Sequence, residues 1–222
     1  MAKLLFDIES VGFPLESFDE DQQKYLMRFA ATEEEREEAK RKLNLNAPTA
    51  QVIAIGMMNP ETLSGEVLYQ APEGEGSTTS DGDIEFRSGG ERDLLARFWD
   101  TVTHYDQFIT FNGRSFDCPF LLLRSAMIGV KPSRNLLPNR YSHLHIDLLD
   151  QLTFYGATRK FSLDFYCKSF GIKSPKSNGI TGLDLGDLYR AGKHREIAEY
   201  CLGDLKATAE LWRIWNSHLN FG

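Results

Sequence analysis

The sequence has few cysteines and no long hydrophobic run. Its 222 residues contain three cysteines, far apart and without a C-x-x-C pair, which argues against a disulfide framework or a cysteine-based zinc site and favours a reducing cytoplasm. No run approaches the roughly 18 apolar residues that a membrane-spanning helix needs. Residues 1–7 also lack the pattern of a signal peptide. We therefore expect a cytoplasmic protein with no membrane partner.

Basic residues are also outnumbered. Lys and Arg total 25 against 32 Asp and Glu, a net charge of −7, which at first argues against a nucleic-acid partner because phosphates are bound by Lys and Arg. The charge is uneven, however. Residues 15–45 hold nine acids and six bases, whereas residues 114–176 hold ten bases and four acids. A basic face is therefore compatible with the acidic total, and a hydrophobic content of 41% is enough to build a core.

The apolar residues alternate between strand and helix patterns. With no internal repeat and no second linker, we expect one domain spanning residues 1–222, built on a mixed sheet covered by helices. Residues 15–45 predict a charged helical arm inserted after the first strand, and the Gly-, Ser- and Thr-rich residues 71–83 predict a flexible loop. The predicted strands are 3–8, 51–58, 66–69 and 107–111, another element starts at 146–149, and the predicted helices are 91–103, 116–127, 163–170, 185–191 and 194–218.

Two carboxylates stand at the end of the first predicted strand. Asp7 and Glu9 are two residues apart, and because side chains alternate along a strand, both point to the same side. Carboxylates that share a face repel each other, and such an arrangement is usually found with a cation between them. By itself a D-x-E pair is as well explained by two solvated acids at a strand end.

Two further segments carry acidic residues in positions that often hold functional groups, a strand-to-helix turn and one face of a helix. Asn112-Gly113 ends a predicted strand, and Asp117 opens the next helix with Pro119 in its first turn, although Asp117 could simply cap that helix and Asn112 simply form the turn. In the last predicted helix, Tyr200 and Asp204 lie one turn apart on the same face.

Taken in order, these segments resemble the three motifs of the DEDD-type (DnaQ-like) 3′-5′ exonucleases. The motifs read Asp7-Ile8-Glu9, then Asn112-Gly113-x-x-Phe116-Asp117-x-Pro119-Phe120-Leu121, then Tyr200-x-x-x-Asp204. The position five before the last aspartate is Glu199 rather than a histidine, so they are most similar to the tyrosine-bearing (DEDDy) branch found in the proofreading domains of family B DNA polymerases. The resemblance implies an RNase H-like α/β fold with a mixed five- to six-stranded sheet flanked by helices, here as a stand-alone relative.

The resemblance also implies a two-metal mechanism with Mg²⁺ or Mn²⁺, the hard cations that suit an all-carboxylate site. Asp7 would bridge both cations, Glu9 and Asp204 would complete the first site, and Asp117 would hold the second, partly through water. Tyr200 would orient the attacking water or help to deprotonate it.

The substrate implied by the resemblance is the 3′ end of a single-stranded nucleic acid, with DNA favoured over RNA and nucleoside 5′-monophosphates as products. Asn112 and Phe116 would contact the terminal nucleotides, and Ser10 would meet the 3′-hydroxyl end. Two other functions stay open. One is a catalytically silent nucleic-acid-binding module of the same fold, which the presence of all four acids and the tyrosine disfavours. The other is a nucleotide phosphohydrolase, which would need a closed pocket.

Other polar residues have plainer explanations. His143 and His145 could share a face and bind a metal, but without a third histidine or cysteine nearby, ordinary hydrogen-bonded histidines fit better. Asp147 is equally well explained as a helix cap or as an acid that supports the site. The Gly179-x-x-Gly182 segment, preceded by Lys173 and Lys176, suggests a loop near the site, and a phosphate-binding role for it stays open.

Overall fold

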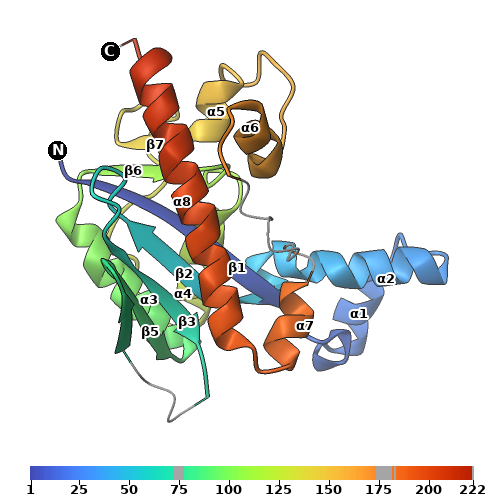
Figure 1. The fold of residues 1–222 in the computed structure, drawn as a ribbon. Coiled ribbons are helices and arrows are strands. Elements are labelled where there is room, and N and C mark those ends of the chain that lie inside the picture. Colours follow the sequence, from blue (N-terminus) through green and yellow to red (C-terminus); the bar gives the residue numbers. More distant parts are fainter. Residues whose placement is uncertain (73–77, 174–181, 183, 222) are drawn as a thin grey trace.

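The architecture is a single mixed sheet of seven strands with helices on both faces (Figure 1). The computed structural model describes residues 1–72, 78–173, 182 and 184–221. The predicted mixed sheet is confirmed, with seven strands in place of five or six. In the order β4-β5-β3-β2-β1-β6-β7, its strands are β1 (Lys3–Gly12), β2 (Ala50–Met58), β3 (Gly65–Gln70), β4 (Thr78–Asp81), β5 (Ile84–Gly89), β6 (Gln107–Thr110) and β7 (His145–Asp147).

The long helix α8 crosses one face of the sheet, and α3 and α4 cover the other, while α1 and α2 project to one side (Figure 1). Among the described residues, no helix is long and apolar enough to cross a bilayer. The α-helices are α1 (Glu20–Leu26), α2 (Glu33–Arg41), α3 (Glu91–Thr101), α4 (Asp117–Met127), α5 (Leu148–Leu152), α6 (Leu163–Ser169), α7 (Leu185–Arg190) and α8 (His194–His218), and the short 3₁₀ turns are η1 (Leu15–Ser17), η2 (Lys42–Leu45), η3 (Ala47–Thr49) and η4 (Val102–His104).

The central strand β1 has different neighbours along its two edges. It pairs antiparallel with β2 along most of its length and parallel with β6 only over Lys3–Leu5. The carboxyl half of β1 therefore runs on past the end of β6. In open α/β sheets, ligands bind beside the carboxyl ends of parallel strands.

The alternation of β1 separates two cores. Leu5 and Val11 pack in the core under α8, whereas Leu4, Phe6 and Ile8 pack in the core under α3 and α4. Residues 7 and 9 belong to the same alternate set as Leu5 and Val11. The two acids of the first motif therefore face α8, as the spacing predicts.

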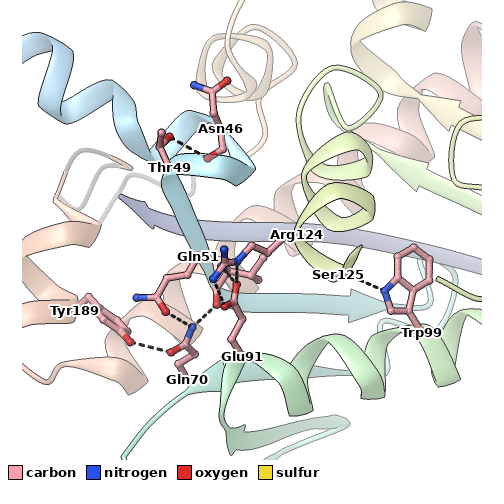
Figure 2. Close-up of polar contacts among 10 residues, drawn as sticks. Asn46, Thr49, Gln51, Gln70, Glu91, Trp99, Arg124, Ser125 and Tyr189 are labelled. Atoms are coloured by element: carbon pink, nitrogen blue, oxygen red, sulfur yellow. Dashed lines mark hydrogen bonds and ion pairs between the residues drawn. The ribbon is translucent and has the colours of Figure 1, made fainter. Parts of the chain in front are cut away.

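Polar side chains tie several helices to the sheet and to one another (Figure 2). Glu91 of α3 receives both arms of the Arg124 guanidinium of α4, each at 2.8 Å, and also accepts the Val52 N–H at 2.8 Å. Across the sheet, the Tyr189 hydroxyl of α7 donates to Gln70 Oε1 of β3 at 2.8 Å. Because the Arg124–Glu91 pair is largely buried and bidentate, it holds α4 firmly in place.

The prediction of a flexible loop over residues 71–83 is wrong for its second half. Thr78–Asp81 form β4, which pairs antiparallel with β5 across a turn that includes Gly82 at φ +60°. Strand β5 was not predicted. Threonine favours strands, and a glycine with positive φ suits a tight hairpin, so these local signals outweigh the polar composition. Most of the Gly179-x-x-Gly182 segment lies outside the described residues.

Residues 15–45, here called the arm, fold into η1, α1, α2 and η2. Asp19 and Thr32 each close a capping box at the start of α1 and α2, which explains why two such short, charged helices form. Tyr25 and Phe29 are 63% and 83% exposed, and the Arg28 guanidinium lies over both rings at 3.7 and 4.6 Å.

Candidate active site

The two acids of β1 lie where this strand runs past the end of β6, with Asp7 half-buried and Glu9 buried. Glu9 is 8% exposed, and its Oε1 is a buried oxygen with no hydrogen-bond partner among the described residues. Burial raises the pKa of Glu9 well above its ordinary value, and the charges of Asp204 and Asp117 raise it further. The pKa of Asp7 is raised in the same way, by burial first and then by Asp117, Glu9 and Asp204. Each carboxylate therefore destabilises the charge of the others.

Asp117 joins this cluster from α4. It lies at the first residue of the helix, is 2% exposed, and accepts a hydrogen bond from the Ile8 N–H at 3.0 Å. The helix-capping alternative is wrong, because Phe116 occupies the capping position and the Asp117 carboxylate is turned to β1. Burial raises the pKa of Asp117 to about 7 even though backbone hydrogen bonds oppose the shift.

The turn before α4 is held by Asp147. Its carboxylate accepts the backbone N–H groups of Asn112 and Arg114 at 2.8 and 2.9 Å, and it also caps α5 through Leu149 N–H at 3.0 Å. Asn112 has φ +63°, a left-handed conformation that asparagine tolerates better than most residues. Asp147 therefore caps α5 and also supports the site by holding the Asn112 turn, so both interpretations apply.

Helix α8 supplies the third motif. Tyr200 and Asp204 lie on its sheet-facing side, and the charge of Asp204 acts on Asp7 and on Glu9. Helix and sheet approach closely because residue 56 of β2, opposite Asp7, is glycine. A Cβ there would lie 2.4 Å from Leu205 Cδ1 and 2.9 Å from Cys201 Sγ. Gly56 is thus a functional position that the predicted site omits, and its only sequence signal is a glycine inside an apolar strand.

The Tyr200 hydroxyl donates a hydrogen bond to the Asp204 carboxylate. Burial, the charges of Asp204, Glu9 and Asp7, and a hydrogen bond to the Asp204 carboxylate all raise the pKa of the phenol above its ordinary value of 10. A phenol held in its neutral form can orient a water molecule but cannot remove its proton at neutral pH.

The donor set fits divalent cations. The carboxylates of Asp7, Glu9, Asp117 and Asp204 act on one another, burial and these charges raise the pKa values of the first three, and one buried oxygen of Glu9 has no partner among the described residues. Hard cations such as Mg²⁺ and Mn²⁺ bind oxygen ligands of this type and would relieve the repulsion. Cys201 is a member of the cluster that the sequence does not reveal: its Sγ lies within 4.8 Å of carboxylate oxygens of Asp7 and Glu9.

The predicted substrate contacts have different surroundings. The Ser10 hydroxyl donates to the Asn44 carbonyl of the arm at 2.7 Å, and Ser10 borders a cavity of about 600 Å³ between the end of β1, the arm and α7. Phe116 is half-buried and packs against Phe120, with ring centroids 5.6 Å apart. Asn112 sits in the turn that Asp147 holds. Contact of these three residues with a nucleotide stays a prediction.

Aromatic and basic side chains gather near α6, where Arg159 and Phe165 are exposed and Phe161 is half-buried. Phe161 and Phe165 stack at 4.3 Å with nearly parallel rings, and the Arg159 guanidinium lies over Phe161 at 5.1 Å. The Tyr166 ring connects this cluster to Phe111, which directly precedes the Asn112 turn. We call Arg159, Phe161 and Phe165 the aromatic platform. It belongs to the chain segment with the largest excess of basic residues.

The histidine pair does not form a metal site. His145 is buried, and its two ring nitrogens lie 2.9 Å from Thr110 Oγ1 and 2.9 Å from the Leu136 carbonyl. Burial lowers the pKa of His145 to about 4. It is an ordinary hydrogen-bonded core histidine.

Comparison with known proteins points to one class of domain. Residues 48–216 match a family model described as a predicted 3′-5′ exonuclease related to the exonuclease domain of PolB. This range contains the second and third motifs, and Asp7 and Glu9 precede it. DNA polymerase 1 of Saccharolobus solfataricus is 30% identical over 118 residues, and a DNA polymerase of Methanocaldococcus jannaschii is 26% identical over 143 residues.

These relatives are much longer than the chain. The alignments cover 46% and 56% of the chain but only 13% and 8% of the two polymerases. Among solved structures, the family B DNA polymerase of Pyrobaculum calidifontis superposes with a TM-score of 0.61 and 18% identity over 97% of the chain and 24% of the polymerase. At that identity the likeness speaks for the fold, and it confirms the predicted RNase H-like class.

Proposed function

Because the chain belongs to the family of predicted 3′-5′ exonucleases related to the exonuclease domain of PolB, we propose that it is a metal-dependent 3′-5′ exonuclease acting on single-stranded DNA. The observation that carries the proposal is the convergence of Asp7, Glu9, Asp117 and Asp204, with raised pKa values for the first three and a buried Glu9 oxygen that has no partner among the described residues. A protein gains nothing in stability from such a cluster of like charges unless cations bind it.

Each carboxylate has a proposed place in the site. Asp7, at the centre of the cluster, would touch both cations, Glu9 and Asp204 would complete the first site, and Asp117 would serve the second, partly through water. When bound, the cations supply an activated water and stabilise charge on the attacking and leaving oxygens. Asp117 keeps its orientation through the Ile8 N–H, so it is preorganised before any ligand arrives.

Tyr200 would hold the attacking water. Its hydroxyl would be neutral and hydrogen-bonded to Asp204. It would orient the water molecule beside the carboxylates without taking up its proton. Ser10 and the adjacent cavity would receive the 3′-hydroxyl end, and Asn112 and Phe116 would contact the terminal nucleotides. Glu9 and Asp117 are buried, and the lower dielectric around them strengthens their polar contacts.

The aromatic platform supports a single-stranded substrate. Bases stack on exposed aromatic rings without regard to sequence, and a guanidinium above a ring adds a cation–π contact and a partner for phosphate. The platform reaches the Asn112 turn through Tyr166 and Phe111, so a strand that stacks there can lead its end to the carboxylates. The proposed preference for DNA over RNA rests on the similarity of the chain to DNA polymerases.

The test is a degradation assay with labelled ends. Purified protein is incubated with 5′-labelled single-stranded DNA, duplex DNA or RNA, in Mg²⁺, Mn²⁺ or EDTA, beside Asp204→Asn. We expect a ladder that shortens from the 3′ end of single-stranded DNA in either metal, and none in EDTA or with the variant. Metal binding without hydrolysis of any substrate would contradict the proposal and favour a silent binding module.

A further inference from the structure

Cys201 is a buried thiol at the carboxylate cluster that the proposed mechanism does not use. It is fully buried, and its Sγ lies 3.9 Å from the Asp7 carbonyl. The Sγ and carboxylate oxygens of Asp7 and Glu9 all lie within 4.8 Å of one another. Asp7 and Glu9, which would hold a hard cation, thus lie beside the sulfur of Cys201, which is a soft ligand.

The position of the thiol is fixed by packing. Cys201 follows Tyr200 on α8 and points at β2, where glycine at position 56 leaves room for the sulfur. On the other side of the cluster, Glu9 is more than nine-tenths buried, and its Oε1 has no hydrogen-bond partner among the described residues. An unpaired buried carboxylate oxygen beside a thiol is costly without a ligand and well suited to one.

Ligand chemistry then decides which cation this side of the site prefers. Oxygen ligands alone suit Mg²⁺ or Mn²⁺, whereas a cysteine sulfur with carboxylates is typical of Zn²⁺ and of its softer analogue Cd²⁺. Zinc–ligand bonds of about 2.0–2.3 Å allow one ion to reach all three residues after small side-chain rotations. Burial and the nearby acids raise the pKa of the free thiol, and a bound dication would cancel those charges.

We propose that Asp7, Glu9 and Cys201 form a site for a soft divalent cation, Zn²⁺ or Cd²⁺, which shares two carboxylates with the Mg²⁺ or Mn²⁺ site and so competes with it. Binding replaces the thiol proton, which passes to solvent, and no electrons are transferred. The site would make the protein sensitive to traces of soft metals. Cation binding does not depend on the nuclease assignment, but the inhibition rests on the proposed function.

The plainer explanation is that Cys201 only fills space and donates its S–H to the Asp7 carbonyl. A protein that keeps Cys201 as its only thiol distinguishes this explanation from metal binding. The chain has three cysteines, so Cys118→Ser with Cys167→Ser leaves Cys201 as the only thiol. Titration with Cd²⁺ is followed in the ultraviolet, where a thiolate–cadmium bond gives a charge-transfer band. Circular dichroism melting confirms that each variant is folded.

We expect the single-thiol protein to develop the band, saturating at one Cd²⁺ per chain, and to lose it when Cys201→Ser is added. Glu9→Gln should weaken Cd²⁺ binding about tenfold or more because it removes one charged ligand. A folded single-thiol protein without the band would overturn the proposal, as would a band that Glu9→Gln leaves unchanged.

Activity gives the second readout. In millimolar Mg²⁺, micromolar Zn²⁺ should inhibit hydrolysis by the wild-type protein, and Cys201→Ser should need about tenfold more Zn²⁺ for the same inhibition. If the band forms but Mg²⁺ supports no hydrolysis, the proposed function fails and the metal site stands. If hydrolysis is normal and no band forms, the metal site fails and the function stands.

Discussion

The Asp117 carboxylate accepts the backbone N–H of Ile8 at 3.0 Å, which joins two motifs that are 109 positions apart in the sequence. The bond lies where β1 runs past the end of β6, so Asp117 takes the place of a neighbouring strand for this part of β1. Asp117 thereby closes the strand edge, and its charge acts on both acids of β1.

Asp117→Asn separates these two roles. The amide oxygen of asparagine can still accept the Ile8 N–H, so we expect the fold to persist. The loss of a charged ligand should lower exonuclease activity more than about 100-fold. Initial rates on single-stranded DNA in Mn²⁺ measure the effect, with the exposed Asp100→Asn on α3 as the matched control. Activity within a few-fold of wild type would exclude Asp117 from the metal site.

Stability should fall as pH rises when no metal is present. Burial raises the pKa of Asp117 from its ordinary value of 3.8 to about 7, so between these values the folded chain holds a proton that the unfolded chain releases. The contribution of Asp117 to the free energy of unfolding is therefore greatest below pH 3.8, and it is lost as the pH rises through about 7. The raised pKa values of Asp7 and Glu9 act in the same direction.

Thermal melting in EDTA between pH 5 and pH 8 tests this sign. The melting temperature of Asp117→Asn should exceed that of wild type by a margin that grows with pH, because the variant has no charge to develop. Mg²⁺ or Mn²⁺ should stabilise wild type more at pH 8 than at pH 5. A margin that shrinks with rising pH would show that the buried acids are not mutually destabilising.

Tyr200→Phe should slow the reaction without stopping it. Because the phenol pKa is raised above 10, we expect the hydroxyl to stay neutral and to orient water rather than to deprotonate it. We expect kcat to fall about 10- to 100-fold, less than the loss of a strong general base would cost. The shape of the pH–rate profile below pH 10 should stay the same. A variant that loses an ionisation from that profile would identify Tyr200 as a base instead.

Gly56→Ala should disturb the site from a distance. A Cβ at Gly56 would meet Leu205 Cδ1 at 2.4 Å and Cys201 Sγ at 2.9 Å, so α8 must move away from the sheet and carry Asp204 with it. We expect a loss of about 1–3 kcal/mol in unfolding free energy and a clear fall in kcat. Gly186→Ala in α7, whose Cβ would find its nearest neighbour at 3.5 Å, is the matched control for stability and should leave the unfolding free energy nearly unchanged. Equal effects of the two variants would contradict the close-approach role.

Local patterns were enough to predict most of the sheet and the shared face of Asp7 and Glu9. Alternation in β1 decides which side chains face α8, and helical spacing places Tyr200 one turn from Asp204. The polar composition of this region hid the β4–β5 hairpin, whose pairing forms only in the folded sheet. As a result, β5 was not predicted and Thr78–Asp81 were predicted to be loop.

The contacts that hold the site were beyond local patterns, because they join distant segments. Asp147 fixes the Asn112 turn 35 positions away, and nothing in its own neighbourhood distinguishes this from a simple helix cap. Cys201 has no second cysteine at metal-binding spacing, so it becomes a candidate ligand only when α8 lies on β2 beside Asp7. Gly56 carried a faint signal, a lone glycine in an apolar strand.

The most direct test follows the 3′-terminal nucleotide itself. Single-stranded DNA labelled in that nucleotide is mixed with excess wild-type protein or Asp7→Asn in Mn²⁺, and the first labelled product is identified by mass. Our account predicts a nucleoside 5′-monophosphate from the wild type and no product from Asp7→Asn. Release of the label as an oligonucleotide or a nucleoside 3′-phosphate, or equal release by Asp7→Asn, would contradict it.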